Sequence, residues 1–285
     1  MKKYLFPVVA LVATMASCTS DVEDAVNVNE NKSHEYALSL KPFEFEDATR
    51  VILEETGSGI NFKWDFSEVF GVFPINPENG QVRWELTKED DCPDEDHYAL
   101  FRGAGWLLEE DNIYAAYHPY NGDAPNNTPY TAVPVSLPSA QGGTLSAIAP
   151  YDYIWAINQN HILAECIQDG KPKNSIVFDF SHAIAIVQIQ VPANIVDGIY
   201  VTANEGNPFI TSGTMNAATG AVTAGASTNR ISLSDPETVK NGVATFYMAV
   251  FPTTTGACTI HAGGLSFQVA SKTLKAGKAY RWICQ

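Results

Sequence analysis

The sequence has few basic residues and no long hydrophobic run beyond its amino-terminal segment. Only 17 of its 285 residues are Lys or Arg, against 32 Asp or Glu, which gives a formal net charge of −15. Proteins that bind nucleic acid without sequence preference, or that dock onto anionic membrane surfaces, carry clustered basic residues. The acidic balance therefore argues against both kinds of partner.

The sequence also lacks the short motifs that mark common catalytic sites. It contains no Gly-x-Ser-x-Gly, no His-Glu-x-x-His, no phosphate-binding glycine loop and no Cys-x-x-Cys, and its six histidines are scattered. A pair of carboxylates for glycoside hydrolysis has no fixed sequence spacing. We predict that the protein is not an enzyme and holds no cofactor or metal. An exported hydrolase is the least favoured of three functional hypotheses.

The amino terminus has the pattern of an export signal. Lys2 and Lys3 precede an apolar run over residues 4–16, and the stretch Met-Ala-Ser-Cys ends at Cys18. A basic start, a short apolar run and small residues before a cysteine are typical of a lipoprotein signal, although an ordinary secretory signal is the alternative. We predict a signal peptide over 1–17, acylation of Cys18 and a flexible acidic tether over 18–34.

No long helical periodicity is present, and short alternating segments separated by turn residues predict an all-β fold. The strongest segment is residues 178–191, FDFSHAIAIVQIQV, whose apolar phase changes at Val187. This change predicts a bulge or a switch of packing partner in a central strand. His182 on its apolar face is typical of a hydrogen-bonded core histidine. With 45% hydrophobic residues, the chain can fill two cores, and we predict domains at 35–173 and 174–285.

Four cysteines follow Cys18, and their state stays open. Cys258 and Cys284 both lie on predicted carboxy-terminal strands, where they could pair or remain buried free thiols, while Cys92 and Cys166 have no assigned partner. Trp84, Trp106, Trp155 and Trp282 could include a platform for stacking sugars, but core packing explains most of them more simply.

Several segments, in this order, resemble the fimbrillin family of Bacteroidetes, whose members are lipoprotein precursors of type V pilus subunits. They are the cysteine at 18, the strand at 36–40 followed by Arg50, GVF at 71–73, YAAYHPY at 114–120, DYIWA at 152–156, FDFSHAIAIVQIQV, AVFPTT at 249–254 and LKAGKAYRW at 274–282. Each motif is short, and their order and spacing carry the resemblance.

The resemblance implies two transthyretin-like β-sandwich domains in tandem and a structural role in a surface fimbria. In the family, a trypsin-like protease cuts after an Arg behind the first strand, and a strand from another subunit replaces that strand. Here the matching residue is Arg50, which would leave Val51 as the new amino terminus. Tyr36, Leu38 and Leu40 would then form the displaced strand. The expected partners are other fimbrial subunits, an outer-membrane lipid anchor and a host or bacterial surface ligand.

For the donor strand, the sequence leaves two possibilities open. The sequence ends at Gln285 without an evident extra segment, which favours a tip or accessory subunit. The other possibility is that the last strand is itself the donor, through Ala279, Tyr280, Arg281, Trp282 and Ile283. The alternative to a fimbrial subunit is a surface lipoprotein that binds glycans for nutrient capture.

Overall fold

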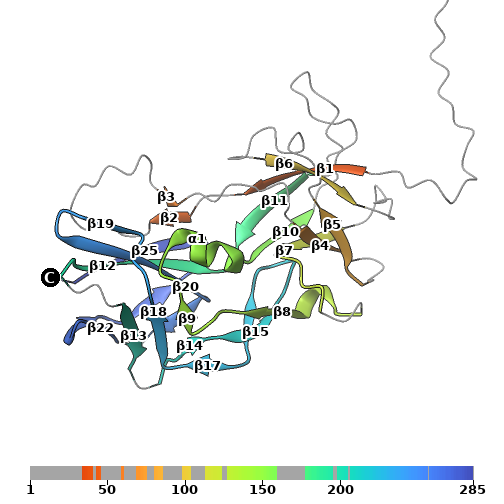
Figure 1. Cartoon of the computed structure of the whole chain (residues 1–285). Helices are drawn as coiled ribbons and strands as arrows, with labels where there is room; N and C mark the ends of the chain where they lie inside the picture. The colour runs from red at the N-terminus through yellow and green to blue at the C-terminus, as the bar shows by residue number, and fades with distance from the viewer. Residues whose placement is uncertain are drawn as a thin grey trace, which may run out of the picture. The chain divides into compact units, whose positions relative to one another are not determined.

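The computed structural model describes residues 34–40, 43–45, 59–60, 69–75, 80–85, 98–103, 113–123, 127–158, 177–194, 198–204, 206–255 and 257–284 (Figure 1). These residues lie within one compact unit, Ser33–Gln285. They form short strands, together with the single-turn helix α1 (Leu145–Ile148) and two 3-10 turns, η2 (Tyr130–Ala132) and η3 (Ala149–Tyr151). The predicted all-β class is confirmed. Within the described ranges, no helix has the length and apolar character needed to cross a membrane.

Seven strands form a sheet that closes on itself. Their order is β1 (His34–Leu40), β11 (Val177–His182), β10 (Ile154–Asn158), β7 (Tyr114–His118), β4 (Val69–Pro74), β5 (Val82–Glu85) and β6 (Tyr98–Gly103), and β6 pairs back onto β1. Alternate residues of β4, β7, β10 and β11 share one face. With Trp84 of β5 they form the first core, whose buried members are Phe70, Val72, Trp84, Tyr114, Ala116, Ile154, Ala156, Phe178 and Phe180.

A glycine in this sheet makes room for a buried tyrosine. Gly71 of β4 pairs with Tyr117 of β7, and a Cβ atom at residue 71 would lie 2.0 Å from Cε1 of the Tyr117 ring. The Tyr117 hydroxyl donates to Oε1 of Gln81 at 2.5 Å and accepts from the backbone N–H of Asn121 at 3.1 Å. Burial raises the pKa of Tyr117 to about 12, so it stays protonated. The GVF motif therefore has a packing role.

The stretch 178–191 divides into two strands that belong to different sheets. After β11 the chain bends at Ala183 and Ile184 and continues as β12 (Ala185–Pro192). A switch of packing partner occurs as predicted, but at Ala183 and Ile184 and not at Val187: Phe178 and Phe180 face the first core, whereas β12 lies in the next sheet. At the bend, Nδ1 of His182 lies 2.7 Å from Oδ1 of Asp152, which confirms a hydrogen-bonded core histidine.

The second sheet has six strands, and two of its neighbouring strands, β12 and β20 (Val243–Val250), are buried on both faces. Its order is β19 (Thr238–Lys240), β20, β12, β25 (Lys278–Ile283), β2 (Phe43–Phe45) and β3 (Gly59–Ile60). One face of β20 packs into a second hydrophobic core, which includes Phe246 and Met248. Its other face packs into a third core, which includes Tyr247 and Ala249. Burial on both faces explains why β12 and β20 are mostly apolar, with Gln188, Gln190 and Thr245 as the polar exceptions.

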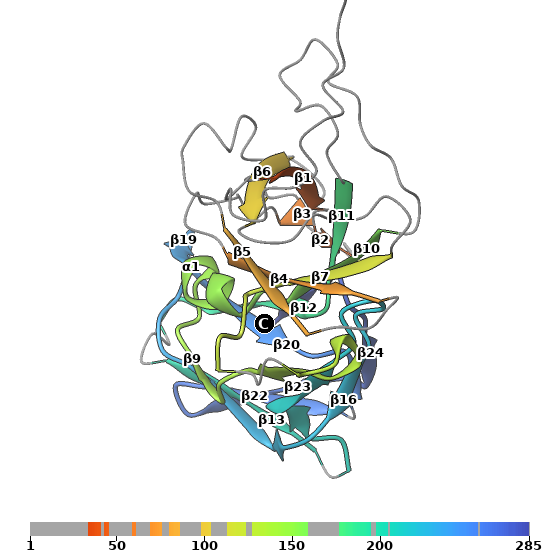
Figure 2. The same cartoon turned by 90° about the vertical axis from the view of Figure 1, so that its right-hand side faces the viewer.

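A third sheet covers the second core. It has the order β23 (Leu265–Val269), β22 (Cys258–Ala262), β13 (Ile199–Ala203), β18 (Arg230–Leu233) and β9 (Ala140–Gln141). Figure 2 shows β13 and β22 below β20, with β4 and β7 above it. The two sheets thus face each other across the second core.

Three smaller sheets complete the described fold, and the first lies on the third core. They are β8 (Val133–Ser136) with β15 (Ser212–Met215) and β16 (Val222–Ala224), β14 (Phe209–Ile210) with β17 (Ser227–Thr228), and β21 (Thr253–Thr255) with β24 (Lys272–Leu274). The pairs β8–β15 and β9–β18 join residues on both sides of the predicted boundary at 173/174. That boundary stays a prediction, and strand pairing does not follow it.

The side chain of Gln141 bonds to the backbone of β20 as a neighbouring strand would. Its Nε2 donates to the carbonyl of Ala249 at 2.9 Å, and its Oε1 accepts from the Ala249 N–H at 2.9 Å. The backbone N–H of Tyr247 donates to the carbonyl of Gly143 at 2.7 Å. β19 pairs only with residues 243–245 of β20, so Gln141 and Gly143 satisfy backbone groups beyond its end.

Candidate functional site

The amino-terminal strand β1 completes the closed sheet. It runs antiparallel to β6, from His34 opposite Gly103 to Ser39 opposite Tyr98. It runs parallel to β11, from Ala37 opposite Val177 to Leu40 opposite Phe180. A sheet of this order without β1 would have two edge strands, β6 and β11, with unpaired N–H and C=O groups.

The three predicted displaced residues lie in β1, and two of them are in register with the first core. Leu38 pairs with Phe178 and Leu40 with Phe180, and both Phe side chains are buried at 2% and 0% exposure. Tyr36 pairs with Phe101 of β6. The residue between the two leucines, Ser39, pairs with Asp179, whose side chain is exposed. The register thus follows the apolar and polar alternation of the sequence.

The next strand, β2, belongs to a different sheet. Glu44 and Phe45 pair in parallel with Lys278 and Ala279 of β25, and Phe43 pairs antiparallel with Ile60 of β3. The sequence indicated one strand before Arg50, whereas the structure has two, and the alternation of Phe43 and Phe45 was the signal for the second. The amino-terminal segment therefore contributes one strand to each of the two large sheets.

The predicted processing residues lie outside the described residues. Arg50 and Val51 fall in residues 46–58, which connect β2 to β3, and Cys18 precedes β1. Their roles stay predictions. Chain order nevertheless has a consequence: both β1 and β2 precede Arg50, so a cut there would separate both strands from the rest of the chain.

The predicted donor residues Ala279, Tyr280, Arg281, Trp282 and Ile283 lie in β25, which is flanked by β12 and β2. Tyr280 and Trp282 belong to the second core, at 1% and 6% exposure. On the other face, Nε of Arg281 donates to Oε1 of Gln188, and Nε2 of Gln188 donates to the Tyr247 hydroxyl at 2.7 Å. This row of side chains joins β25, β12 and β20, so β25 is firmly held in its own sheet.

The family model for fimbrillin-like proteins matches residues 109–282, more than half of this chain. The chain belongs to the fimbrillin-like family. The matched residues include all of β7 and β8 to β24 and most of β25, but they do not include β1, β2 or Arg50. Comparison with curated proteins gave no match.

Solved structures from Bacteroides and Porphyromonas species are similar to this fimbrillin-like chain. A candidate cell adhesion protein from Bacteroides ovatus superposes with a TM-score of 0.53 at 15% identity, covering 90% of this chain and 92% of its own. A candidate cell adhesion protein from Bacteroides uniformis gives 0.49 at 15% identity, with 87% and 91% covered. The tip fimbrial protein Mfa3 from Porphyromonas gingivalis gives 0.46 at 9% identity, with 88% and 94% covered. The first of these similarities supports the fold alone.

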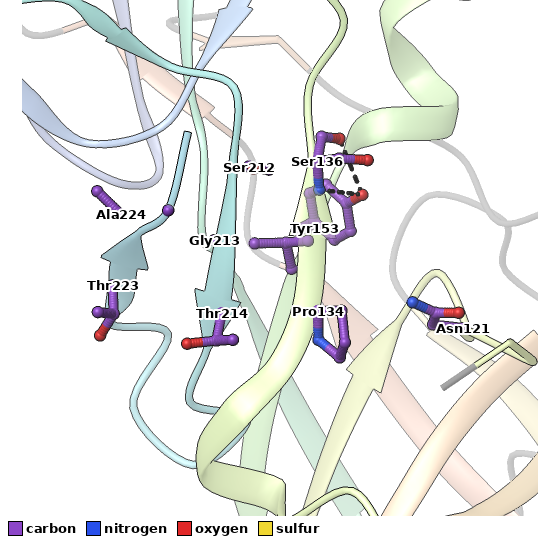
Figure 3. A pocket seen from close by; sticks show the side chains of 11 residues that line it. Asn121, Pro134, Ser136, Tyr153, Ser212, Gly213, Thr214, Thr223 and Ala224 are labelled. Carbon is purple, nitrogen blue, oxygen red and sulfur yellow. Dashed lines mark hydrogen bonds between the residues drawn. The ribbon is translucent and has the colours of Figure 1, made fainter. Parts of the chain in front are cut away.

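A pocket with a volume of about 530 Å³ lies on the β8–β15–β16 sheet of the fimbrillin-like chain (Figure 3). The hydroxyl of Tyr153, one of its lining residues, is held in place, because it donates to the Ser136 carbonyl and accepts from the Ser136 N–H, both at 3.0 Å. The lining has no charged side chain and combines apolar surface with hydroxyl and amide groups; it consists of Asn121, Pro134, Val135, Ser136, Tyr153, Ser212, Gly213, Thr214, Thr223, Ala224 and Gly225.

The described tryptophans pack into the protein. Trp84 is 2% exposed and Trp282 is 6% exposed, while Trp155 packs against the third core beside Gly220, and Trp106 lies outside the described residues. Among the described side chains, no aromatic ring is fully exposed. In the same residues there is no group of three or more His, Cys, Asp or Glu that could hold a metal ion.

Cys258 and Cys284 are buried thiols in the second core and form no disulfide, so the disulfide between these two cysteines is wrong and the buried-thiol alternative holds. Burial raises the pKa of the Cys258 thiol, partly offset by a hydrogen bond with Thr255. Burial raises the pKa of Cys284 to about 11. Because the thiolate is the reactive form, both thiols should be inert in the native protein.

We expect this inertness to be measurable in a variant with Cys18, Cys92 and Cys166 all replaced by Ser. At pH 8 the native Cys284 thiol should react with a chromogenic disulfide reagent about a hundredfold more slowly than a free thiol, because its pKa of about 11 leaves about a hundredth of the usual thiolate; the Cys258 thiol should also react more slowly than a free thiol. The same variant in guanidinium serves as the control and should release two equivalents at once. Rapid modification of the native variant would contradict the assignment.

Proposed function

We propose that this chain is a structural subunit of a cell-surface fimbria, with a role in adhesion, that assembles by protease-triggered strand exchange. Membership of the fimbrillin-like family supports the fimbrial role. The observation that carries the mechanism is the position of β1 and β2, which precede Arg50 and each complete a different sheet. Cleavage after Arg50 would remove the covalent link of both strands to the rest of the chain in a single step.

The consequence of strand loss follows from backbone pairing. Departure of β1 would leave β6 and β11 with unpaired N–H and C=O groups next to Phe178 and Phe180. Departure of β2 would leave the outer edge of β25 unpaired. An extended strand from another subunit satisfies such groups and fills the apolar positions, which is β-augmentation. Tyr36, Leu38 and Leu40 are the residues we propose the incoming strand to mimic.

On this proposal β25 is an acceptor edge in preference to a donor. Use of β25 as the donor strand stays a prediction that its position disfavours. Its release would expose Tyr280 and Trp282 and break the row from Arg281 to Tyr247. A donor strand that is not part of its own subunit's core would expose no such side chains when it moves to another subunit. The subunit would therefore receive strands at two places.

Before cleavage, the precursor would be held at the outer membrane by lipid on Cys18. Apolar burial of acyl chains gives such anchoring, and the acidic segment 18–34 would serve as the tether. Processing at Arg50 would then release the subunit from its anchor into the fimbrium. Its partners would be other fimbrial subunits and a host or bacterial surface ligand.

A glycan-binding surface lipoprotein is the alternative proposal, and the hydroxyl-lined pocket is the one observation in its favour. Sugar sites commonly use an exposed aromatic face together with polar groups. The described aromatic side chains offer no fully exposed ring. The fimbrial proposal is therefore preferred.

The test of the fimbrial proposal is the amino-terminal sequence and intact mass of the protein recovered from the cell surface. We expect the wild-type chain to begin at Val51. Arg50→Ala should fold normally, keep its acylated Cys18 and fail to assemble, because β1 and β2 stay covalently attached.

The matched control is Lys41→Ala, which removes the basic residue between β1 and β2. This variant should be processed and assembled as the wild type is, because a cut at Lys41 would leave β2 in place. A wild-type chain beginning at Cys18 in assembled fimbriae, or assembly by Arg50→Ala, would overturn the proposal.

A further inference from the structure

The strand β23 is an unprotected sheet edge. Among the described residues it pairs only with β22, from Cys258 opposite Val269 to Ala262 opposite Leu265. Native sheets usually protect an edge with a charged residue, a proline, a bulge or a very short strand. The five-residue strand β23, Leu-Ser-Phe-Gln-Val, has none of these features.

The other edge strands of the three larger open sheets are protected, and β23 differs from them in this respect. β19 has three residues and ends with Lys240, β8 carries Pro134, and β16 has three residues, while β3 and β9 have two each. Gln141 and Gly143 cover the part of β20 beyond β19.

The hairpin geometry identifies the backbone groups at the open edge. Gly263 and Gly264 have φ values of 53° and 83°, as a two-residue type I′ turn requires. In such a hairpin the residues next to the turn form a hydrogen-bonded pair, and alternate pairs follow. Leu265, Phe267 and Val269 thus bond to β22, whereas the N–H and C=O groups of Ser266 and Gln268 point away from it.

The side chains of β23 alternate in the same way. Phe267 and Val269 pack against the second core but remain partly exposed, and Leu265 is 53% exposed. Ser266 and Gln268 lie on the outer face, where they contact His261 and Thr259. The apolar row at this margin would become buried if the sheet were extended by one more strand.

The occupant that fits this edge is β23 of a second copy. With Phe267 opposite Phe267 across a two-fold axis, Ser266 lies opposite Gln268 of the other copy and Leu265 opposite Val269. This register matches hydrogen-bonding groups with hydrogen-bonding groups, and apolar positions with apolar positions. A register shifted by one residue would place the outward hydrogen-bonding groups of one copy opposite groups of the other copy that already bond to β22.

Charge favours the same occupant. The chain carries a net charge of −15, so copies repel each other over most of their surface. Residues 241–271, which include β22 and β23, contain no Asp, Glu, Lys or Arg. Two copies can therefore approach here without facing like charges.

We propose that β23 is a lateral contact at which two copies of this chain form an antiparallel, two-fold symmetric pair. The pairing forms about four backbone hydrogen bonds between Ser266 and Gln268 of the two copies. It joins the two five-stranded sheets into one continuous sheet. The contact is separate from β1, β2 and Arg50, so it does not depend on strand exchange.

The first test is sedimentation of the acylated chain that begins at Cys18, purified in mild detergent, over about 1–500 μM. The wild type should dimerise with rising concentration. Gln268→Pro removes an outward N–H but no bond to β22, and should raise the dissociation constant at least about tenfold. Gln268→Thr keeps the N–H and the strand propensity, and should change the constant by less than about threefold.

The second test fixes the register by cross-linking, in a background with Cys92 and Cys166 replaced by Ser. Residues in a non-hydrogen-bonded antiparallel pair have Cα atoms about 4.5 Å apart, which is within disulfide range. Phe267→Cys should therefore give a covalent dimer on mild oxidation, whereas Leu265→Cys should not. Thermal unfolding of both variants checks that they fold.

A wild-type chain that stays monomeric over this range would overturn the proposal and leave the edge to a different protein. Dimerisation that Gln268→Pro leaves unchanged would overturn it too, as would equal cross-linking of Phe267→Cys and Leu265→Cys.

Discussion

Asp152→Ala should lower the free energy of unfolding by about 3–5 kcal/mol, because it removes one partner of a buried polar pair. Asp152 and His182 are 5% and 3% exposed, and their Oδ1 and Nδ1 atoms are 2.7 Å apart. Without the carboxylate, the His182 Nδ1 atom loses this partner in an environment that excludes water. The measurement is urea unfolding monitored by tryptophan fluorescence.

Two further variants separate this effect from a general sensitivity to mutation. Asp152→Asn keeps an oxygen that can accept from Nδ1 and should cost less, about 1–2 kcal/mol. Asp123→Ala removes an exposed carboxylate and should change stability by less than about 0.5 kcal/mol. A loss below about 1 kcal/mol for Asp152→Ala would show that the pair is not important for stability.

The large expected effect has a structural reason beyond the pair itself. His182 is the last residue of β11, and Asp152 lies two residues before the first residue of β10, Ile154, which is the register partner of His182. The backbone N–H of Ala183 also donates to the carbonyl of Tyr153 at 2.7 Å. These bonds fix the point at which the chain leaves the closed sheet and enters the six-stranded sheet, so they position β12 between the second and third cores.

Local patterns were sufficient to predict the elements whose burial is regular. The phase change in residues 178–191 indicated a switch of packing partner, and the chain makes this switch between β11 and β12, before the predicted Val187. His182 was identified because a histidine on an apolar strand face must find a hydrogen-bond partner. Its partner, Asp152, is 30 residues away and has no spacing signature.

Non-local pairing was beyond the sequence patterns. The strands β21 (Thr253–Thr255) and β24 (Lys272–Leu274) have three residues each and no clear alternation, so a period of two cannot be detected. β9 has only two residues, yet it places Gln141 against Ala249, 108 residues away. Such contacts are determined by tertiary packing, and this is also why residues before 173 pair with strands of the carboxy-terminal half.

The arrangement of β1 leads to the second large expected effect, which rests on the proposed function. After cleavage at Arg50, the segment containing β1 and β2 should remain bound without a covalent link, because both strands are paired in their sheets. A labelled peptide with the sequence of residues 33–50 should then exchange into the cleaved protein over time. Incorporation at equilibrium is measured by gel filtration with fluorescence detection.

Two charged peptides test whether incorporation depends on the register of β1. Leu38→Lys places a cation at the register partner of the buried Phe178, and should weaken incorporation at least about a hundredfold because an unpaired charge beside a core is costly. Ser39→Lys adds the same charge opposite the exposed Asp179, and should leave incorporation within about threefold of the unmodified peptide. Equal incorporation of the two charged peptides would show that β1 is not the exchanged strand. Failure of the unmodified peptide to enter the cleaved protein would show that the closed sheet does not release it.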